Sequence, residues 1–436
     1  MEARRTTPLR GRSIRAAWFT EFRKNSLWLV PSVCVLGAIV LSNLTIAADR
    51  RGGLRDVVDA YFTTDLEDAR QVVATVSVAM LTFVGVVFSI TLVALQLAST
   101  QYSPRVVRSF VRRPATKWTL GIFLATFAFA FNTLAAFESG DPAAGEPFIP
   151  AASVAVTYLL VFATLFVFIV FVHRIVQAMR VTYVIEAIAT ETRRAIVQAQ
   201  EVAAAFPPVE VPRLGTPTAE VRMQGRTGVI GGIDTRELVR LAHSHGSCYR
   251  VPHAVGEFLP YDTVLVEVHG GEPPTWLAVR RCFELGSERT LYQDPAYGIR
   301  QLVDIAVRAL SPGVNDPTTA TQVIDRLVDL LARIAGRAMP AGVYVDDDDV
   351  VRLVRPVPTW ERFVDLAFTE IRHFGGHLPQ VTRRLVAAFE DLERVVPPQR
   401  AEPVRRQMEL LGRHVGETVH DERAVFALTP DRMGLG

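Results

Sequence analysis

The sequence predicts an α-helical membrane protein: four transmembrane helices followed by a cytoplasmic α+β domain. The main observation is a set of four mostly apolar, uncharged stretches, all in the first part of the chain. A helix that spans a bilayer needs about 20 apolar residues, because lipid offers no hydrogen-bond partner to an exposed backbone. We therefore expect the lipid bilayer to surround four spans, at about residues 26–48, 71–100, 118–137 and 150–172.

The charges beside these stretches predict the orientation. Basic residues fill the tail of residues 1–25 and the segment between the second and third spans, which contains no acid, and Arg174 and Arg180 follow the fourth span. The other two loops contain most of the acids of this region. Segments rich in Lys and Arg remain on the cytoplasmic side. We expect both termini in the cytoplasm and the protein in the cell inner (plasma) membrane.

The second span has an ordered set of polar residues. They recur every seven positions, which keeps them near one helix face: Thr75, Thr82, Ser89, Gln96 and Ser103. One interpretation is a packing seam, where small and hydroxylated side chains let helices approach closely. The other is a face that lines a water-filled path in a homo-oligomer. No Asp, Glu, His, Lys or Arg occurs from position 71 to 104, which argues against a proton relay within this helix.

The rest of the chain divides by composition. We expect a stalk helix at residues 173–205 that continues the fourth span, a linker at 206–218, a β-rich barrel-like module at 219–285 and a mainly helical module at 286–436. The order of the β segments resembles the barrel-sandwich fold of biotinyl and lipoyl carriers. No lysine follows Lys117, so carrier chemistry is excluded.

Two helices of the last module have clear start signals. Asp294-Pro295 and Asp316-Pro317 each place an N-capping aspartate before a proline at the first helical position. Residues around these starts form a possible cytoplasmic ligand or switch site: Asp294, Tyr297, Arg300, Asp304, Asn315 and Asp316. A helix N-terminus can hold an anion. The competing interpretation, which we favour, is that Asp316 already occupies the free amides as a cap.

Metal ligands are present but not in a known pattern. His243, His245, Cys248 and His253 cluster in sequence without the spacing of a closed zinc site. The run of four aspartates at 346–349 favours a solvated loop. We therefore expect no metal and no cofactor, and the three cysteines form no disulfide framework. The net charge of +2 gives no reason to expect nucleic acid as a partner.

Three segments resemble a known family. They are FSITLVALQ at residues 88–96 with SPR at 103–105, QDPAYGIR at 293–300, and ALSPGVNDPTTA at 309–320. The chain resembles bacterial predicted membrane proteins that are grouped only as domain of unknown function 2254. The resemblance implies a multi-pass membrane protein and no particular activity.

Three functions remain open at this point. The leading hypothesis is an oligomeric channel or transporter gated by its cytoplasmic domain, and the alternative is a membrane-anchored binding or signalling module without transport. No P-loop, GxGxxG, GxSxG or HExxH motif occurs, so we expect no enzyme and assign no catalytic residue. If the chain were an enzyme, Tyr297, Arg300, Asp304 and Asp316 would be its candidate groups.

Overall fold

The computed structural model describes residues 28–51, 66–101, 114–138, 150–206, 209–418 and 422–433. The expected basic tail at 1–25, the first residues of the first span and Ser103 lie outside the described residues. The described residues form two compact units, which divide after Arg180.

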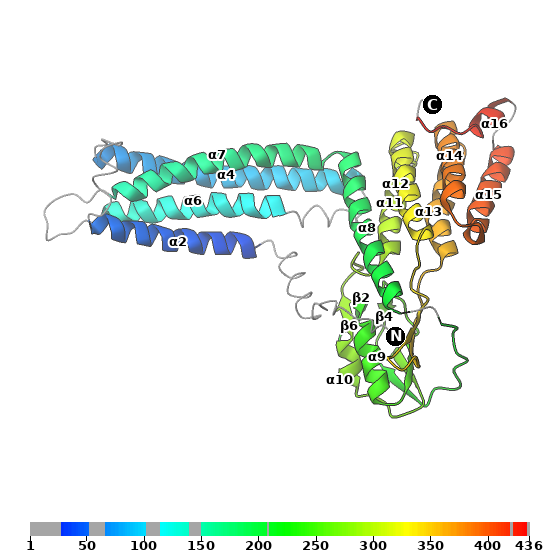
Figure 1. The fold of residues 1–436 in the computed structure, drawn as a ribbon. Coiled ribbons are helices and arrows are strands. Elements are labelled where there is room, and N and C mark those ends of the chain that lie inside the picture. Colours follow the sequence, from blue (N-terminus) through cyan, green and yellow to red (C-terminus); the bar gives the residue numbers. More distant parts are fainter. Residues whose placement is uncertain are drawn as a thin grey trace, which may run out of the picture. The chain divides into compact units, whose positions relative to one another are not determined.

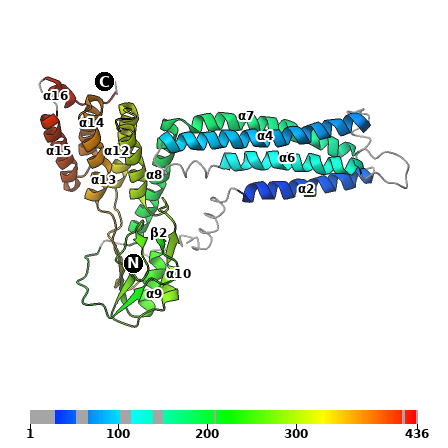
Figure 2. The same cartoon turned by 180° about the vertical axis from the view of Figure 1, so that it is seen from behind.

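The first unit consists of four long helices that lie side by side (Figures 1 and 2). They are α2 (Leu29–Arg50), α4 (Leu66–Gln101), α6 (Pro114–Glu138) and α7 (Ala151–Ala178). Among the described residues, these four helices are long and apolar enough to cross a membrane, as the sequence predicts. Helices α6 and α7 each contact the other three, and α6 makes the more extensive contacts with α2 and α4.

Polar contacts join the four helices in addition to apolar packing. The hydroxyls of Thr126 in α6 and Thr164 in α7 lie 2.9 Å apart. Asp49, at the end of α2, accepts hydrogen bonds from the backbone amides of Ala152 and Ser153 at 2.9 and 3.1 Å and from the Ser153 hydroxyl at 2.8 Å. Asp49 thus caps the N-terminus of α7, where Pro150 offers no side-chain cap.

The second unit begins with α8 (Val181–Ala205). We expected one continuous stalk helix, but α7 ends at Ala178 and α8 begins after a break at Met179 and Arg180. One face of α8 is buried and packs against α11 (Pro295–Ala309) and α12 (Pro317–Ala335). The buried apolar residues of α8, Ile185, Ile188 and Ile196, therefore belong to the core of the second unit.

The strands form two sheets. Their bounds are β1 (Ala219–Arg222), β2 (Gly228–Ile233), β3 (Cys248–Arg250), β4 (Phe258–Leu259), β5 (Val264–His269), β6 (Phe283–Gly286), β7 (Val343–Val345) and β8 (Val351–Val354). One sheet has the order β1-β5-β3-β8-β7 and the other has the order β4-β2-β6. Among the described strands, only β3 and β8 pair in parallel, with Tyr249 opposite Leu353.

The expectation of a barrel-like module is not confirmed. In the described residues neither sheet closes on itself. In the larger sheet, β3 pairs with β5 on one side and with the distant strand β8 on the other. The larger sheet therefore continues into the β7–β8 hairpin instead of closing on itself. Its core also contains residues of α9 (Thr235–Ser244) and α10 (Trp276–Arg281).

The remaining helices extend the helical part of the second unit outward from α11 and α12. They are α13 (Trp360–Gly375), α14 (Pro379–Val395), the 3₁₀ turn η1 (Pro398–Arg400), α15 (Glu402–Thr418) and α16 (Glu422–Ala427). Helix α13 packs on α11, and α14 packs on α12. The described part of the second unit is thus an α+β domain, as the sequence predicts.

Candidate functional site

The polar stripe of α4 lies on the outward face of the single-chain bundle. Thr75, Thr82, Ser89 and Gln96 are all exposed. The buried side chains of the same helix lie on its opposite side at 100° per residue: Ala69, Val73, Ser77, Met80, Val87 and Ala94. The stripe therefore does not pack against the other described helices of this unit.

Two hydroxyls of the stripe donate to their own helix. Thr75 donates to the carbonyl of Gln71 at 2.7 Å, and Thr82 donates to the carbonyl of Val78 at 3.1 Å. Gly85 is on the same face, and a Cβ at this position would meet no heavy atom within 4 Å. The face is thus weakly polar, and the backbone of α4 is open to close approach at Gly85.

The cytoplasmic candidate residues begin with Asp294. Its carboxylate is 3% exposed, accepts a hydrogen bond from the amide of Tyr297 at 3.0 Å and forms an ion pair with Arg289 at 2.7 Å. Burial raises the pKa of Asp294, although Arg289 and the Tyr297 amide act to lower it. The Arg289 guanidinium also lies over the Tyr297 ring, 5.1 Å from its centroid. Asp294 is therefore the N-cap of α11, as predicted, within a buried ion pair that the sequence did not predict.

Arg300 and Asp304 form a second group on α11. Arg300 donates to Asp304 at 2.7 Å and pairs with Glu370 of α13. The hydrogen bond to Glu370 raises the pKa of Arg300, which stays charged. The guanidinium thus joins two helices, and sequence spacing could predict Asp304 as its partner but not Glu370.

Asn315 and Asp316 lie in the turn between α11 and α12. Asp316 accepts from the amide of Thr319 at 3.0 Å and from its hydroxyl at 2.5 Å, so it caps α12 as expected. Asn315 has φ of 48°, in the left-handed region that asparagine tolerates. The amides at the start of α12 therefore already have a carboxylate partner.

These groups do not converge on one site. Helix α11 has 15 residues, which corresponds to a length of about 22 Å. Asp294 and Tyr297 lie at its start, while Asn315 and Asp316 follow its end. The positions named for a possible enzyme are divided in the same way, and the absence of enzyme activity stays a prediction.

The histidine cluster is also dispersed. His253 contacts Glu257, and His245 contacts the carbonyl of Leu241. Burial raises the pKa of the Cys248 thiol to about 11. This thiol is therefore protonated at neutral pH, which does not favour a metal ligand.

His243 instead lies beside the aspartate loop. Its Nδ1 is 2.7 Å from Asp346, and ligand atoms of His243, Asp346 and Asp348 lie within 4.8 Å of one another. The same carboxylate of Asp346 also accepts from Arg352 at 2.6 Å. Arg352 supplies positive charge where a cation would bind. The contacts of Asp346 with His243 and Arg352 therefore explain the aspartate loop as a structural feature, without a metal.

Comparison with known proteins identifies the family. The family described as predicted membrane protein, DUF2254, matches residues 24–391. Uncharacterised proteins of Mycobacterium tuberculosis and Mycobacterium bovis are each 30% identical over 415 residues, which is 92% of this chain and 78% of the relative. No solved structure matches the chain. The chain belongs to the DUF2254 family, which confirms the resemblance of its three segments.

Proposed function

We propose that this member of the DUF2254 family of predicted membrane proteins is a homo-oligomeric, channel-type transport protein. Copies meet through the outward face of α4, and the stripe of Thr75, Thr82, Ser89 and Gln96 lines a path between them. The C-terminal unit, from Val181 onward, acts as the gate or regulator.

The observation that carries this proposal is the exposure of the whole described stripe. An outward face of a membrane helix contacts either lipid or another protein, and polar side chains are unfavourable in lipid. Polar contacts between membrane helices contribute about 0.6 kcal/mol each on average. Four such positions therefore favour association of the copies, but their contacts alone are too weak to cause it. In a channel these side chains have a further role, because they contact the water in the path.

The membrane and the orientation are part of the proposal. Basic segments before α2, between α4 and α6, and after α7 support an orientation with both termini in the cytoplasm, and we propose that the protein lies in the plasma membrane. In this orientation the C-terminal unit lies in the cytoplasm.

Disulfide trapping tests the association. Ser89→Cys should give an oxidised dimer in native membranes, because identical stripes face each other across the axis. Phe88→Cys is the matched control: Phe88 is also exposed but points about 100° away on the helix. The parent chain controls for Cys34, Cys248 and Cys282. Equal cross-linking of the two variants, or none for either, would remove the basis for an interface at the stripe.

Flux through the reconstituted oligomer tests transport. In liposomes, modification of Ser89→Cys by a water-soluble thiol reagent should reduce the flux, and the same treatment of Phe88→Cys should not. A folded oligomer that conducts no common ion or small solute contradicts the channel.

One observation favours a second function, a membrane-anchored binding or signalling module. The hydroxyl protons of Thr75 and Thr82 are already donated to carbonyls of α4, and Gly85 leaves room for a closely packed helix. Both features suit a dry seam between two copies. This alternative predicts the same Ser89→Cys dimer but no flux and no modification of Ser89→Cys by the water-soluble reagent.

A further inference from the structure

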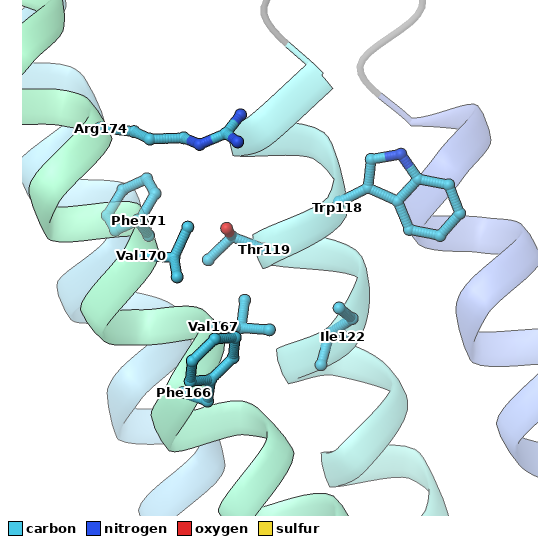
Figure 3. A pocket seen from close by; sticks show the side chains of 8 residues that line it. All are labelled: Trp118, Thr119, Ile122, Phe166, Val167, Val170, Phe171 and Arg174. Carbon is cyan, nitrogen blue, oxygen red and sulfur yellow. The ribbon is translucent and has the colours of Figure 1, made fainter.

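A cavity opens between α6 and α7 in the membrane unit (Figure 3). Its volume is about 380 Å³. The residues that line it come from the first half of α6 and the second half of α7: Trp118, Thr119, Ile122, Phe166, Val167, Val170, Phe171 and Arg174. The side chains of Phe166 and Trp118 are exposed, so the cavity is a groove that opens on the surface of the membrane unit.

The lining is apolar along the groove and charged at one end. Phe166, Val167 and Val170 contribute hydrocarbon, whereas Arg174 lies at the end nearest the start of α6. Figure 3 shows the Arg174 side chain extending from α7 toward α6, across that end of the groove. Within the described residues no acidic side chain forms an ion pair with Arg174. The groove thus combines a hydrocarbon surface with one cationic head.

The position of the groove matches the boundary between hydrocarbon and lipid headgroups. Arg174 lies four residues before the end of α7 at Ala178, and Trp118 lies four residues after the start of α6 at Pro114. Tryptophan and arginine at the ends of spans are placed where phosphates occur. The segment that precedes α6 also contains Arg105, Arg108, Arg112 and Arg113 and no acid. A cluster of this kind beside a span attracts anionic lipids.

We propose that this groove binds an anionic phospholipid, with one acyl chain between α6 and α7 and the phosphate on Arg174. The volume of the groove suits a single acyl chain and is too small for a protein helix, whose diameter is about 10 Å. The apolar lining distinguishes a lipid from free phosphate, since only a lipid gains by filling it. The lipid would hold α6 and α7 together at the end from which the chain continues into α8.

Lipid-dependent thermal stability of the full-length protein in a non-ionic detergent tests the headgroup. Phosphatidylglycerol should raise the midpoint of unfolding in a saturable way, because a ligand of the folded state stabilises it. Arg174→Gln should weaken the apparent affinity about tenfold, as expected for loss of one charge-assisted hydrogen bond. Arg180→Gln removes the same charge outside the groove and should leave the affinity within about twofold. Equal losses in the two variants would overturn the proposal, as would an equal effect of inorganic phosphate alone.

A second pair of variants tests the acyl chain. Val170→Phe places an aromatic ring in the groove. Ile169→Phe is the control: it adds the same ring at the preceding residue of α7, which is exposed and does not line the groove. Native mass spectrometry should detect phosphatidylglycerol on the parent and on Ile169→Phe, with a loss of fivefold or more on Val170→Phe. Retention of the lipid by Val170→Phe at the level of Ile169→Phe would exclude the groove as its site.

Discussion

Single residues of the segment QDPAYGIR each contact a different neighbouring element. The side chain of Gln293 accepts from the amide of Ile233 in β2 at 3.0 Å. Asp294 caps α11 and binds Arg289, and Arg300 binds Glu370 in α13. Gly298 lies against Thr192 of α8. The segment therefore joins the β sheets, α8 and α13, so its distinctive sequence has a structural explanation.

Gly298 should not tolerate a methyl group. A Cβ there would overlap the Thr192 hydroxyl and lie 2.9 Å from Leu291 Cδ2. Alanine in a helix is otherwise more favourable than glycine by about 1 kcal/mol, but overpacking costs about 1–3 kcal/mol. We expect Gly298→Ala to lower the free energy of unfolding of the second unit, as measured by thermal melting of the full chain. Gly313→Ala, at an exposed position with open space, is the control. A neutral Gly298→Ala would mean that α8 and α11 pack less closely.

Asp346 should hold the β7–β8 loop through its charge. Burial acts to raise its pKa, but contacts with His243, Arg352 and two backbone amides outweigh it and hold the pKa of Asp346 below its usual range. A lowered pKa contributes stability that is present above the unfolded value, about 3.9, and is lost as the pH falls below it. We expect Asp346→Asn to cost about 1–2 kcal/mol in local opening of the hairpin. Hydrogen exchange of the β7 and β8 amides measures this cost, with exposed Asp347→Asn as the control.

At the scale of elements, the turn between α11 and α12 stabilises the start of α12, because it contains the N-cap Asp316. Asp316→Ala should cost about 1 kcal/mol of stability, because the amide of Thr319 loses its acceptor. Asparagine still caps helices, so Asp316→Asn should restore most of that stability. Exchange of the first amides of α12 in the full chain distinguishes the two variants. If Asp316→Asn lost as much stability as Asp316→Ala, the negative charge of Asp316 would be required, and a neutral capping hydrogen bond would not explain the turn.

Elements with local signals were predictable from the sequence. The caps Asp294 and Asp316 each accept the expected backbone amide three residues later. The four membrane helices follow from length and hydropathy, because the bilayer imposes both. Such features depend on residues within about one turn or one span, so a single sequence contains the whole signal.

Non-local contacts account for what was not predictable. The pairing of β3 with β8 places Tyr249 opposite Leu353, about a hundred positions away in the sequence. A contact that closes so long a loop produces no periodic pattern in the sequence from which it could be predicted. Glu370 was missed as the partner of Arg300 for the same reason. Arg289 is only five positions from Asp294, but the segment between them is irregular and gives no fixed spacing from which the pair could be predicted. The outward direction of the α4 stripe was also open, since a heptad repeat gives one face but not what that face contacts.

At the scale of the whole molecule, each membrane helix has one face that the described part of its own chain leaves open. On α4 that face contains the polar stripe, and between α6 and α7 it contains the groove with Arg174. The two surfaces call for different occupants, because one is weakly polar along its length and the other is apolar with a charge at its end. A second copy and a phospholipid are therefore complementary proposals, and each has its own test.

The orientation of the chain connects these proposals. We expect Ser139→Cys, between α6 and α7 in sequence, to react with a membrane-impermeant maleimide in intact spheroplasts. Thr216→Cys, at an exposed position of the second unit, should react only after lysis, and the parent chain gives the background from its own cysteines. The basic segments require this result, because Lys and Arg are retained on the cytoplasmic side. Labelling of Thr216→Cys in intact spheroplasts would mean that the orientation is the opposite of the proposed one. Arg174 would then lie in the outer leaflet, away from the anionic cytoplasmic surface, and a cytoplasmic gate on the α4 path would be excluded.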